Sequence, residues 1–344
     1  MLSTSYTNVD TRTEPFFAPE PVSWSQPFTQ HDHGVRHLSS RPNIHAVGQP
    51  RRKDVNGACA AHARSLRDLE VSYDAKQRIL WQFMNPRERA CFTPEMIDEI
   101  SRTLTLAEDL SREADTSGDP AIDYLVLSSR VPGIFNLGGH LPLFMRLIED
   151  QNKEALRAYA HSCVNEQYRW AINLDLPICT IAVVQGDALG GGFEAALAHD
   201  LIIAERSANF GLPEVLFNLF PGMGAYTFLS RKLDSARAEK MILSGKVYSA
   251  DELYEMGVVN RVVDDGKGVE AVHDLIREQE RTAQTWRAVF RVRQIVNPVT
   301  RQEMMDITDM WVDMAMNLAP KDLRRMRHLA VAQDRRWAKI RNAA

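Results

Sequence analysis

The stretch "ALGGGFEAALAHD" (residues 188–200) places three consecutive glycines directly before a phenylalanine and Glu194. Glycine loses more backbone entropy on folding than any other residue, so three in a row are costly inside a regular element. The glycines lie between an apolar run at 177–184 and helix-compatible residues at 193–200, which predicts a tight strand-to-helix turn. The Gly191 amide at such a helix start can stabilise a developing oxyanion. A packing turn, where a helix crosses closely over a strand, explains the glycines equally well.

A second glycine-flanked turn lies earlier, in "VLSSRVPGIFNLGGHL" (126–141), where an apolar run precedes two glycines and a helix-compatible segment. Two such turns after two strands can direct two backbone amides at one oxygen. A third segment, "SANFGLPEVLFNLFPGMGAYTFLSR" (207–231), carries Glu214 after a proline. On its own, this glutamate is more typical of the first turn of a helix than of a catalyst.

Apolar runs alternate with helical patterns through most of the chain. Two short strands around a polar turn are predicted at 69–84, and a helix follows with Thr93 as N-cap and Pro94 in its first position. Strands that alternate with long helices predict an α/β fold with parallel pairing. The other predicted elements are strands at 122–129, 177–184, 199–205 and 257–263, a long helix at 149–174, and helices alone after residue 263.

Three parts follow from this pattern: a disordered extension at 1–64, a core at 65–265 and a helical subdomain at 266–344. The 344 residues carry 41 Lys and Arg against 45 Asp and Glu, which disfavours wholesale binding of nucleic acid. The four cysteines show no C-x-x-C spacing, as expected of thiols in a reducing compartment. Because no run of about eighteen apolar residues occurs, we expect a cytoplasmic protein without a membrane span.

Together these motifs resemble the crotonase superfamily, the enoyl-CoA hydratases and isomerases. The resemblance rests on "IFNLGGHL", "ALGGGFE", "GLPEV", "PGMGAYTFLSR" and "MILSGKVYSADELYEMGVVNRVV", and it spans about residues 69–265. It implies an α/β fold built as a spiral of ββα units with a C-terminal helical subdomain. Within the superfamily, "VQGDALGGGFEAALAHDLIIAE", "GLPEVLFNLFPGMGAY" and "EMMDITDMWVDMAMNL" look like the bacterial diffusible signal factor synthases, which make cis-2-unsaturated fatty acid quorum-sensing signals.

The resemblance implies an activity and the groups that carry it. The site would dehydrate a 3-hydroxyacyl thioester on acyl carrier protein and then hydrolyse the thioester to release the free acid. Glu214 would take the α-proton, and Glu194 would serve the departing hydroxyl or the attacking water. The amides of Leu137, Gly138 and Gly191 would form the oxyanion hole. No metal or redox cofactor is required.

The acyl chain needs an apolar pocket, and a methionine-rich segment at 307–318 is the candidate wall. Five apolar residues of this segment fall on one helical face: Ile307, Met310, Trp311, Met314 and Leu318. On its own, a stripe of this kind is more often plain core. Because the family places this helix against the acyl pocket, we expect Trp311 and Met314 to line it. Gly190 and Met223 would complete the lining.

Partners follow partly from charge and partly from the resemblance. The last helical pattern, at 321–344, has eight Lys or Arg and two Asp. Because acyl carrier proteins are acidic, this helix is a candidate docking surface, although a solvated basic face is the more common explanation. The resemblance further implies a homo-oligomer, a trimer or a hexamer, and in some members an interaction with the receiver domain of a sensor kinase.

His140 stands where crotonases very often have an acidic residue that caps the following helix. The histidine therefore puts this cap in question. It is more typical of a solvated loop residue than of a catalytic imidazole, because no Ser or Cys nucleophile stands beside it.

Two alternatives to a signal synthase stay open. One is an ordinary enoyl-CoA hydratase or isomerase of fatty acid degradation, which would use the same glutamates and release no free acid. The other is a regulatory binding protein, and the presence of both glutamates disfavours that purely non-catalytic role.

Overall fold

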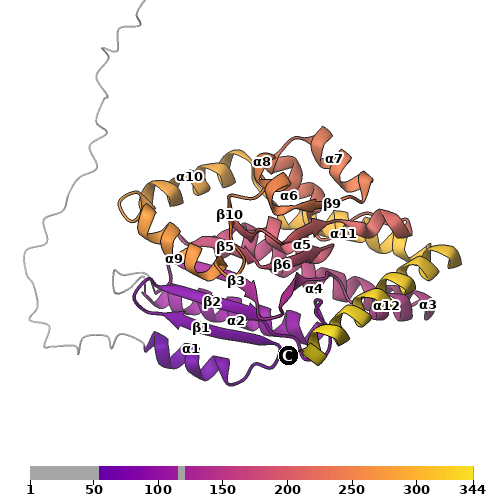
Figure 1. Ribbon diagram of the computed structural model, residues 1–344, viewed down its shortest axis with the longest axis horizontal. Helices are drawn as coiled ribbons and strands as arrows, with labels where there is room; N and C mark the ends of the chain where they lie inside the picture. The colour runs from indigo at the N-terminus through magenta and orange to yellow at the C-terminus, as the bar shows by residue number, and fades with distance from the viewer. Residues whose placement is uncertain (1–53, 115–120, 344) are drawn as a thin grey trace, which may run out of the picture. The chain divides into compact units, whose positions relative to one another are not determined.

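The computed structural model describes residues 54–114 and 121–343 (Figure 1). Its main sheet has six strands in the order β1-β2-β3-β5-β7-β10, of which only the first pair is antiparallel. The strands are β1 (Leu69–Asp74), β2 (Ile79–Met84), β3 (Tyr124–Ser129), β5 (Cys179–Val184), β7 (Leu201–Glu205) and β10 (Arg261–Val263). The predicted α/β fold with parallel pairing is confirmed.

A second sheet of four short strands runs beside the first, in the order β4-β6-β8-β9. Its strands are β4 (Gly133–Asn136), β6 (Gly186–Leu189), β8 (Asn209–Gly211) and β9 (Val247–Ser249). Along the chain, β4, β6 and β8 directly follow β3, β5 and β7, and a helical segment comes after each of them. The strand-strand-helix unit thus repeats, and the crotonase spiral of ββα units is confirmed. Strands of three or four residues are too short to give a periodic signal, so the sequence did not predict them.

The chain turns sharply where it passes from one sheet to the other. The amide nitrogen of the Gln185 side chain donates to the carbonyl oxygens of Ser129 (3.0 Å) and Ile134 (3.1 Å) at this joint. A side chain on the next residue, Gly186, would collide with the carbonyl group of Gly133. The glycine is therefore needed for β4 and β6 to approach each other closely.

Helices cover both faces of the main sheet. Helix α2 (Pro94–Ala114) and helix α4 (Lys153–Ala171) pack on one face, while α9 (Gly268–Gln279) and α10 (Ala283–Val296) cover the other. The predicted cap of α2 is present, because the Met96 amide donates to the Thr93 hydroxyl at 3.2 Å.

The predicted long helix at 149–174 is confirmed as α4, although it begins at Lys153 and ends at Ala171. Helix α3 (Leu141–Glu149) ends, and α4 begins after Asn152, whose side chain accepts a hydrogen bond from the Ala155 amide at 3.1 Å. A second difference concerns the predicted extension. Its last residues form helix α1 (Val55–Ala63), which packs on β1 and buries Cys59, whereas residues 1–53 lie outside the described residues.

The remaining helices complete the fold around the second sheet. Helix α11 (Arg301–Met316) packs along α4, and α12 (Pro320–Ala343) packs against η2 (Pro213–Phe217). Helix α12 also packs against α3, beside which it is drawn in yellow in Figure 1. Over the described ranges, no helix combines the length and the apolar character that a membrane crossing requires. The remaining bounds are η1 (Asn173–Asp175), α5 (Gly191–Leu197), α6 (Ala225–Lys232), α7 (Ser235–Ser244) and α8 (Ala250–Glu255).

Candidate active site

The consecutive glycines lie where other parts of the backbone and a carboxylate come unusually close. Gly190 has φ +52°, and a Cβ atom built on it would lie 2.6 Å from Oε1 of Glu214. A Cβ on Gly192 would collide with the carbonyl oxygen of Asn136. The packing explanation therefore holds for Gly192, which lets α5 approach β4, while Gly190 leaves room for the Glu214 carboxylate.

Gly191 is the first residue of α5, and its amide faces the loop after β4. A Cβ on Gly138 would lie only 2.9 Å from this nitrogen, and one on Gly191 would lie 3.5 Å from the amide nitrogen of Gly139. Within the described parts of the chain, neither the Gly139 amide nor the Gly191 amide has a hydrogen-bond partner. Both residues line one cavity, so two unpartnered N–H groups are available to a single oxygen.

The structure corrects the predicted donors in the first loop. The Leu137 amide donates to the carbonyl oxygen of Ala90 at 2.8 Å, and the Gly138 amide donates to Oδ1 of Asn136 at 2.7 Å. Both N–H groups are therefore already hydrogen-bonded within the protein. The prediction that Leu137 and Gly138 supply oxyanion amides is therefore wrong, and Gly139 takes their place.

The loop that presents Gly139 is held from several sides. The hydroxyl of buried Tyr159 donates to the Phe92 carbonyl oxygen and accepts a hydrogen bond from the His140 amide at 3.1 Å. The Phe92 amide in turn donates to the carbonyl oxygen of Gly138 at 2.8 Å. These bonds fix the peptide groups on both sides of the Gly139 amide.

His140 caps α3, contrary to the expectation that a histidine would weaken this cap. Its Nδ1 accepts a hydrogen bond from the Leu143 amide at 3.0 Å, the role that an acidic side chain would otherwise fill. Partial burial and the nearby Arg89 lower the pKa of the imidazole, which favours the neutral form that can accept this bond.

Glu194 lies in the first turn of α5 and is 1% exposed. Its Oε1 accepts hydrogen bonds from the amides of Met223 (2.8 Å) and Ala225 (2.9 Å), at the start of α6. Burial raises the pKa of this carboxyl to about 7, although the two amides favour its ionised form. The motif "PGMGAY" (221–226) therefore serves as a cradle for this glutamate.

Glu214 lies in η2, and its Oε2 is buried without a hydrogen-bond partner among the described residues. Burial and the negative charge of Glu194 raise its pKa to about 8. An unpartnered buried carboxyl is costly to keep unless a ligand uses it, so perturbed groups of this kind mark functional sites.

The two carboxyl groups act as one titrating pair, because they line the same cavity and the charge of Glu194 raises the pKa of Glu214. Near neutral pH the pair holds about one proton, since ionising both would place two charges in the same buried space. The amides at Glu194 stabilise its ionised form, so the proton favours Glu214. One acid and one base therefore face the same cavity.

The cavity has a volume of about 40 Å³, which is room for a few water molecules. Of the predicted lining residues, Gly190, Met223 and Trp311 face it. Met314 does not: it is 44% exposed on the outer side of α11, so this prediction is wrong. The buried face of α11 differs from the predicted one. Its buried residues are Met304, Thr308, Trp311, Val312 and Ala315.

Trp311 lines this cavity and packs against Gly222 and Phe144. A Cβ atom on Gly222 would lie 2.5 Å from Cγ of Trp311, and the indole ring meets Phe144 edge-on with ring centroids 5.1 Å apart. The Thr308 hydroxyl, one turn earlier, donates to the Gly222 carbonyl oxygen at 2.9 Å. The cavity of about 40 Å³ is too small for a long acyl chain, so part of its wall has to move when such a thioester binds.

Sequence reasoning missed three groups at this site: the Gly139 amide, the Tyr159 hydroxyl and Gln333 of α12. Gln333 lines the cavity and donates to the Leu137 carbonyl oxygen at 3.2 Å. Only Gly139 had a signal in the sequence, as the second glycine of "NLGGH". Among the residues that can be described, no three His, Cys, Asp or Glu side chains are grouped as metal ligands.

The sequence of this chain is similar to a protein family and to several curated proteins. The family model described as enoyl-CoA hydratase/isomerase matches residues 77–321. The chain is 32% identical to the fatty acid oxidation complex subunit alpha of Idiomarina loihiensis, over 57% of this chain and 25% of that protein. It is 33% identical to the mitochondrial methylglutaconyl-CoA hydratase of Rattus norvegicus, over 52% of this chain and 56% of the relative. The chain thus spans less than two thirds of the length of these curated relatives.

Solved structures show the same fold at lower identity. An enoyl-CoA hydratase from Bacillus halodurans has a TM-score of 0.62 at 18% identity, over 76% of this chain and all (100%) of that one. DspI of Pseudomonas aeruginosa has a TM-score of 0.55 at 24% identity, over 72% of this chain and 95% of that one.

Proposed function

Because this chain belongs to the enoyl-CoA hydratase/isomerase family, we propose that it removes water from a 3-hydroxyacyl thioester and then hydrolyses the thioester to a cis-2-unsaturated fatty acid. One observation carries the proposal. The carboxyl groups of Glu194 and Glu214 face the same cavity as two unpartnered backbone amides. This set supplies an acid, a base and an oxyanion site, which the dehydration needs.

The positions of these groups support the following dehydration step. The thioester oxygen accepts hydrogen bonds from the Gly139 and Gly191 amides, which stabilise the enolate that forms when the α-proton leaves. Glu214 in its ionised form takes that proton, while protonated Glu194 gives its proton to the departing hydroxyl group. Since the proton of the resting pair favours Glu214, the empty site is set for hydration, and dehydration requires the proton on Glu194 instead.

Hydrolysis requires a water molecule at the carbonyl carbon and the same oxyanion donors. The cavity of about 40 Å³ has room for a few waters beside both carboxylates. One ionised glutamate takes a proton from the water as it attacks the carbonyl carbon, and the Gly139 and Gly191 amides hold the tetrahedral oxyanion. Collapse of this oxyanion breaks the C–S bond, and the carrier thiol leaves with the proton that the glutamate took up. The support for this second step is the resemblance of the site motifs to the diffusible signal factor synthases.

The carrier is proposed to be an acidic acyl carrier protein, docking on α12. This helix lines the catalytic cavity through Leu329 and Gln333, and it exposes basic side chains, among them Arg324, Arg335 and Lys339. Complementary charge would steer an acidic partner to this edge of the cavity. We further propose a homo-oligomer and, as a regulatory contact, the receiver domain of a sensor kinase, both on the resemblance alone.

The test of the chemistry uses Glu194→Gln and Glu214→Gln, measured with an enoyl thioester for hydration and with a 3-hydroxyacyl thioester for dehydration. Each variant should lose nearly all turnover in both directions, because an amide does not exchange the proton at neutral pH. Glu95→Gln, on the exposed start of α2, is the matched control. Turnover close to the parent's in either active-site variant would remove that glutamate from the mechanism.

A further inference from the structure

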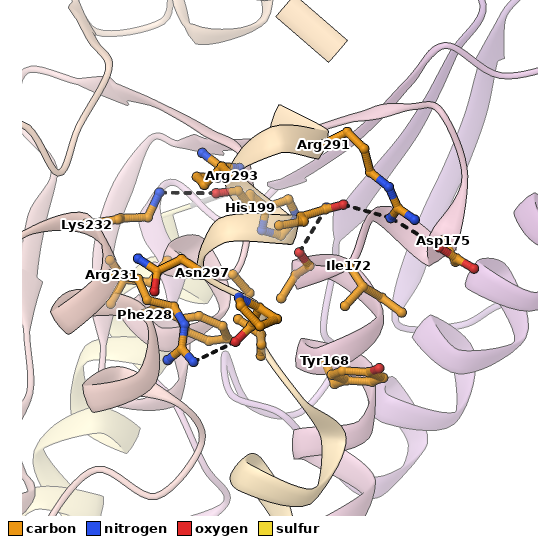
Figure 2. A pocket seen from close by; sticks show the side chains of 16 residues that line it. Tyr168, Ile172, Asp175, His199, Phe228, Arg231, Lys232, Arg291, Arg293 and Asn297 are labelled. Atoms are coloured by element: carbon orange, nitrogen blue, oxygen red, sulfur yellow. Dashed lines mark hydrogen bonds and ion pairs between the residues drawn. The ribbon is translucent and has the colours of Figure 1, made fainter. Parts of the chain in front are cut away.

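A second cavity, of about 350 Å³, is formed by residues of α4, α6, α10 and the segment after α10 (Figure 2). It shares no lining residue with the cavity at Glu194. Its volume falls in the range of small-molecule sites, roughly 300–1,000 Å³. Ile172, Phe228 and Val299 contribute apolar wall, and four basic residues line the same space: Arg231, Lys232, Arg291 and Arg293.

The three guanidinium groups of this cavity each have a carboxylate partner. The pairs are Arg231 with Glu303 at 2.8 Å, Arg291 with Asp175 at 3.3 Å, and Arg293 with Asp200. Their charges are therefore largely balanced. A balanced ion pair has little net charge left to attract a ligand, so these arginines alone do not predict an anion site.

Lys232 differs from the arginines. It is half-buried at the end of α6, and among the described residues no carboxylate lies within ion-pair distance of its ammonium group. Its Nζ donates to the His199 carbonyl oxygen at 3.3 Å, as Figure 2 shows. An ammonium group has three N–H donors, so two are left for another partner.

The charges around Lys232 do not balance. Burial and the positive charge of Arg293 lower the pKa of Lys232 to about 8, and the charge of Asp200 only partly opposes them. Four basic side chains thus face three carboxylates in and around the cavity. A negatively charged group beside Lys232 would relieve this repulsion and satisfy its free donors.

We propose that this cavity binds an organic anion with an apolar body, such as an alkanoate, with the carboxylate on Lys232 and the hydrocarbon part against Phe228 and Val299. The carboxylate pairs with the ammonium group of Lys232, and the hydrocarbon part packs on the apolar wall. A small inorganic anion would leave the apolar wall exposed to water, and a neutral amphiphile would leave the ammonium group unpaired.

The test is photolabelling of the full chain with a decanoate that carries a diazirine near its methyl end, followed by peptide mass spectrometry. We expect label on residues 225–232 or 283–299, which form this cavity. Excess decanoate should suppress that label, whereas decanol and inorganic phosphate at the same concentration should not. Lys232→Gln should reduce it at least about tenfold, the loss expected for one charge-assisted contact.

Two variants control for structure and charge. Lys232→Arg keeps the positive charge and should keep most of the label, and Lys240→Gln, on the exposed surface of α7, should label like the parent. Equal melting temperatures of Lys232→Gln and the parent exclude misfolding. Label confined to 304–316, equal labelling of Lys232→Gln, or equal competition by decanol or by phosphate would overturn the proposal. Label at 304–316 would mark the catalytic cavity instead, because Thr308 and Trp311 line it. The labelling pattern needs no turnover, so failure of this proposal can be told apart from failure of the proposed reaction.

Discussion

Replacing Glu214 by glutamine should make the protein more stable at alkaline pH while removing its activity. The pKa of Glu214 is raised from 4.5 to about 8 by burial and by the charge of Glu194. A carboxyl whose folded pKa is raised contributes stability that is present below the unfolded pKa and is lost as pH rises through the folded pKa. The parent should therefore lose stability between about pH 5 and about pH 9, and the variant should be spared this loss.

The size of the effect follows from the same values. The step from 4.5 to about 8 corresponds to roughly 5 kcal/mol at about 1.36 kcal/mol per pH unit, an upper bound because the site can take up water. The side-chain amide in Glu214→Gln also lacks a hydrogen-bond partner, but the free-energy cost of burying it does not change with pH. The pH dependence of the difference is therefore the quantity to measure.

The assay is urea unfolding of the parent, Glu214→Gln and the control Glu95→Gln at several pH values, with the free energy of unfolding from linear extrapolation. The difference between Glu214→Gln and the parent should grow in favour of the variant by several kcal/mol from about pH 5 to about pH 9. The difference for Glu95→Gln should stay small. A flat difference for Glu214→Gln would refute the buried, proton-sharing pair.

Three further changes probe the oxyanion loop and the cavity wall. Replacing the Gly139 amide by an ester should lower kcat about 10²–10³-fold, and the same change at Leu137 should not, so equal losses would contradict the corrected donor. Tyr159→Phe frees the Phe92 carbonyl and should lower kcat about tenfold with KM little changed; a change in stability alone would make the hydroxyl merely structural. Trp311→Ala should cost about 3–5 kcal/mol in unfolding free energy and shift product ratios from a mixture of 3-hydroxyacyl carrier proteins toward longer chains. An unchanged ratio in the folded variant would place Trp311 in the core alone.

The long strands, the α/β class and the two glutamates could be predicted because each has a local signature. Apolar runs of about six residues mark buried strands, and the motifs around Glu194 and Glu214 are specific enough to indicate a family. The short second sheet could not be predicted, since its strands are held by the joint at Gln185 and Gly186 rather than by any periodic pattern.

The oxyanion donor was misplaced for a related reason. Which amide of "NLGGH" is free depends on partners distant in sequence, such as Ala90 for Leu137 and Tyr159 for His140. Likewise, Met314 lies on the outer side of α11 because the packing of that helix on α4 sets its rotation, and an apolar stripe alone does not.

Mass spectrometry of the products formed from a 3-hydroxyacyl carrier protein, with the matching CoA thioester run in parallel, decides between a signal synthase and a hydratase. We expect a free cis-2-unsaturated fatty acid from the carrier-bound substrate with the parent protein and none with Glu214→Gln. An enoyl chain that stays attached to its carrier or to CoA, with no free acid released, would contradict this expectation and make the protein a simple hydratase.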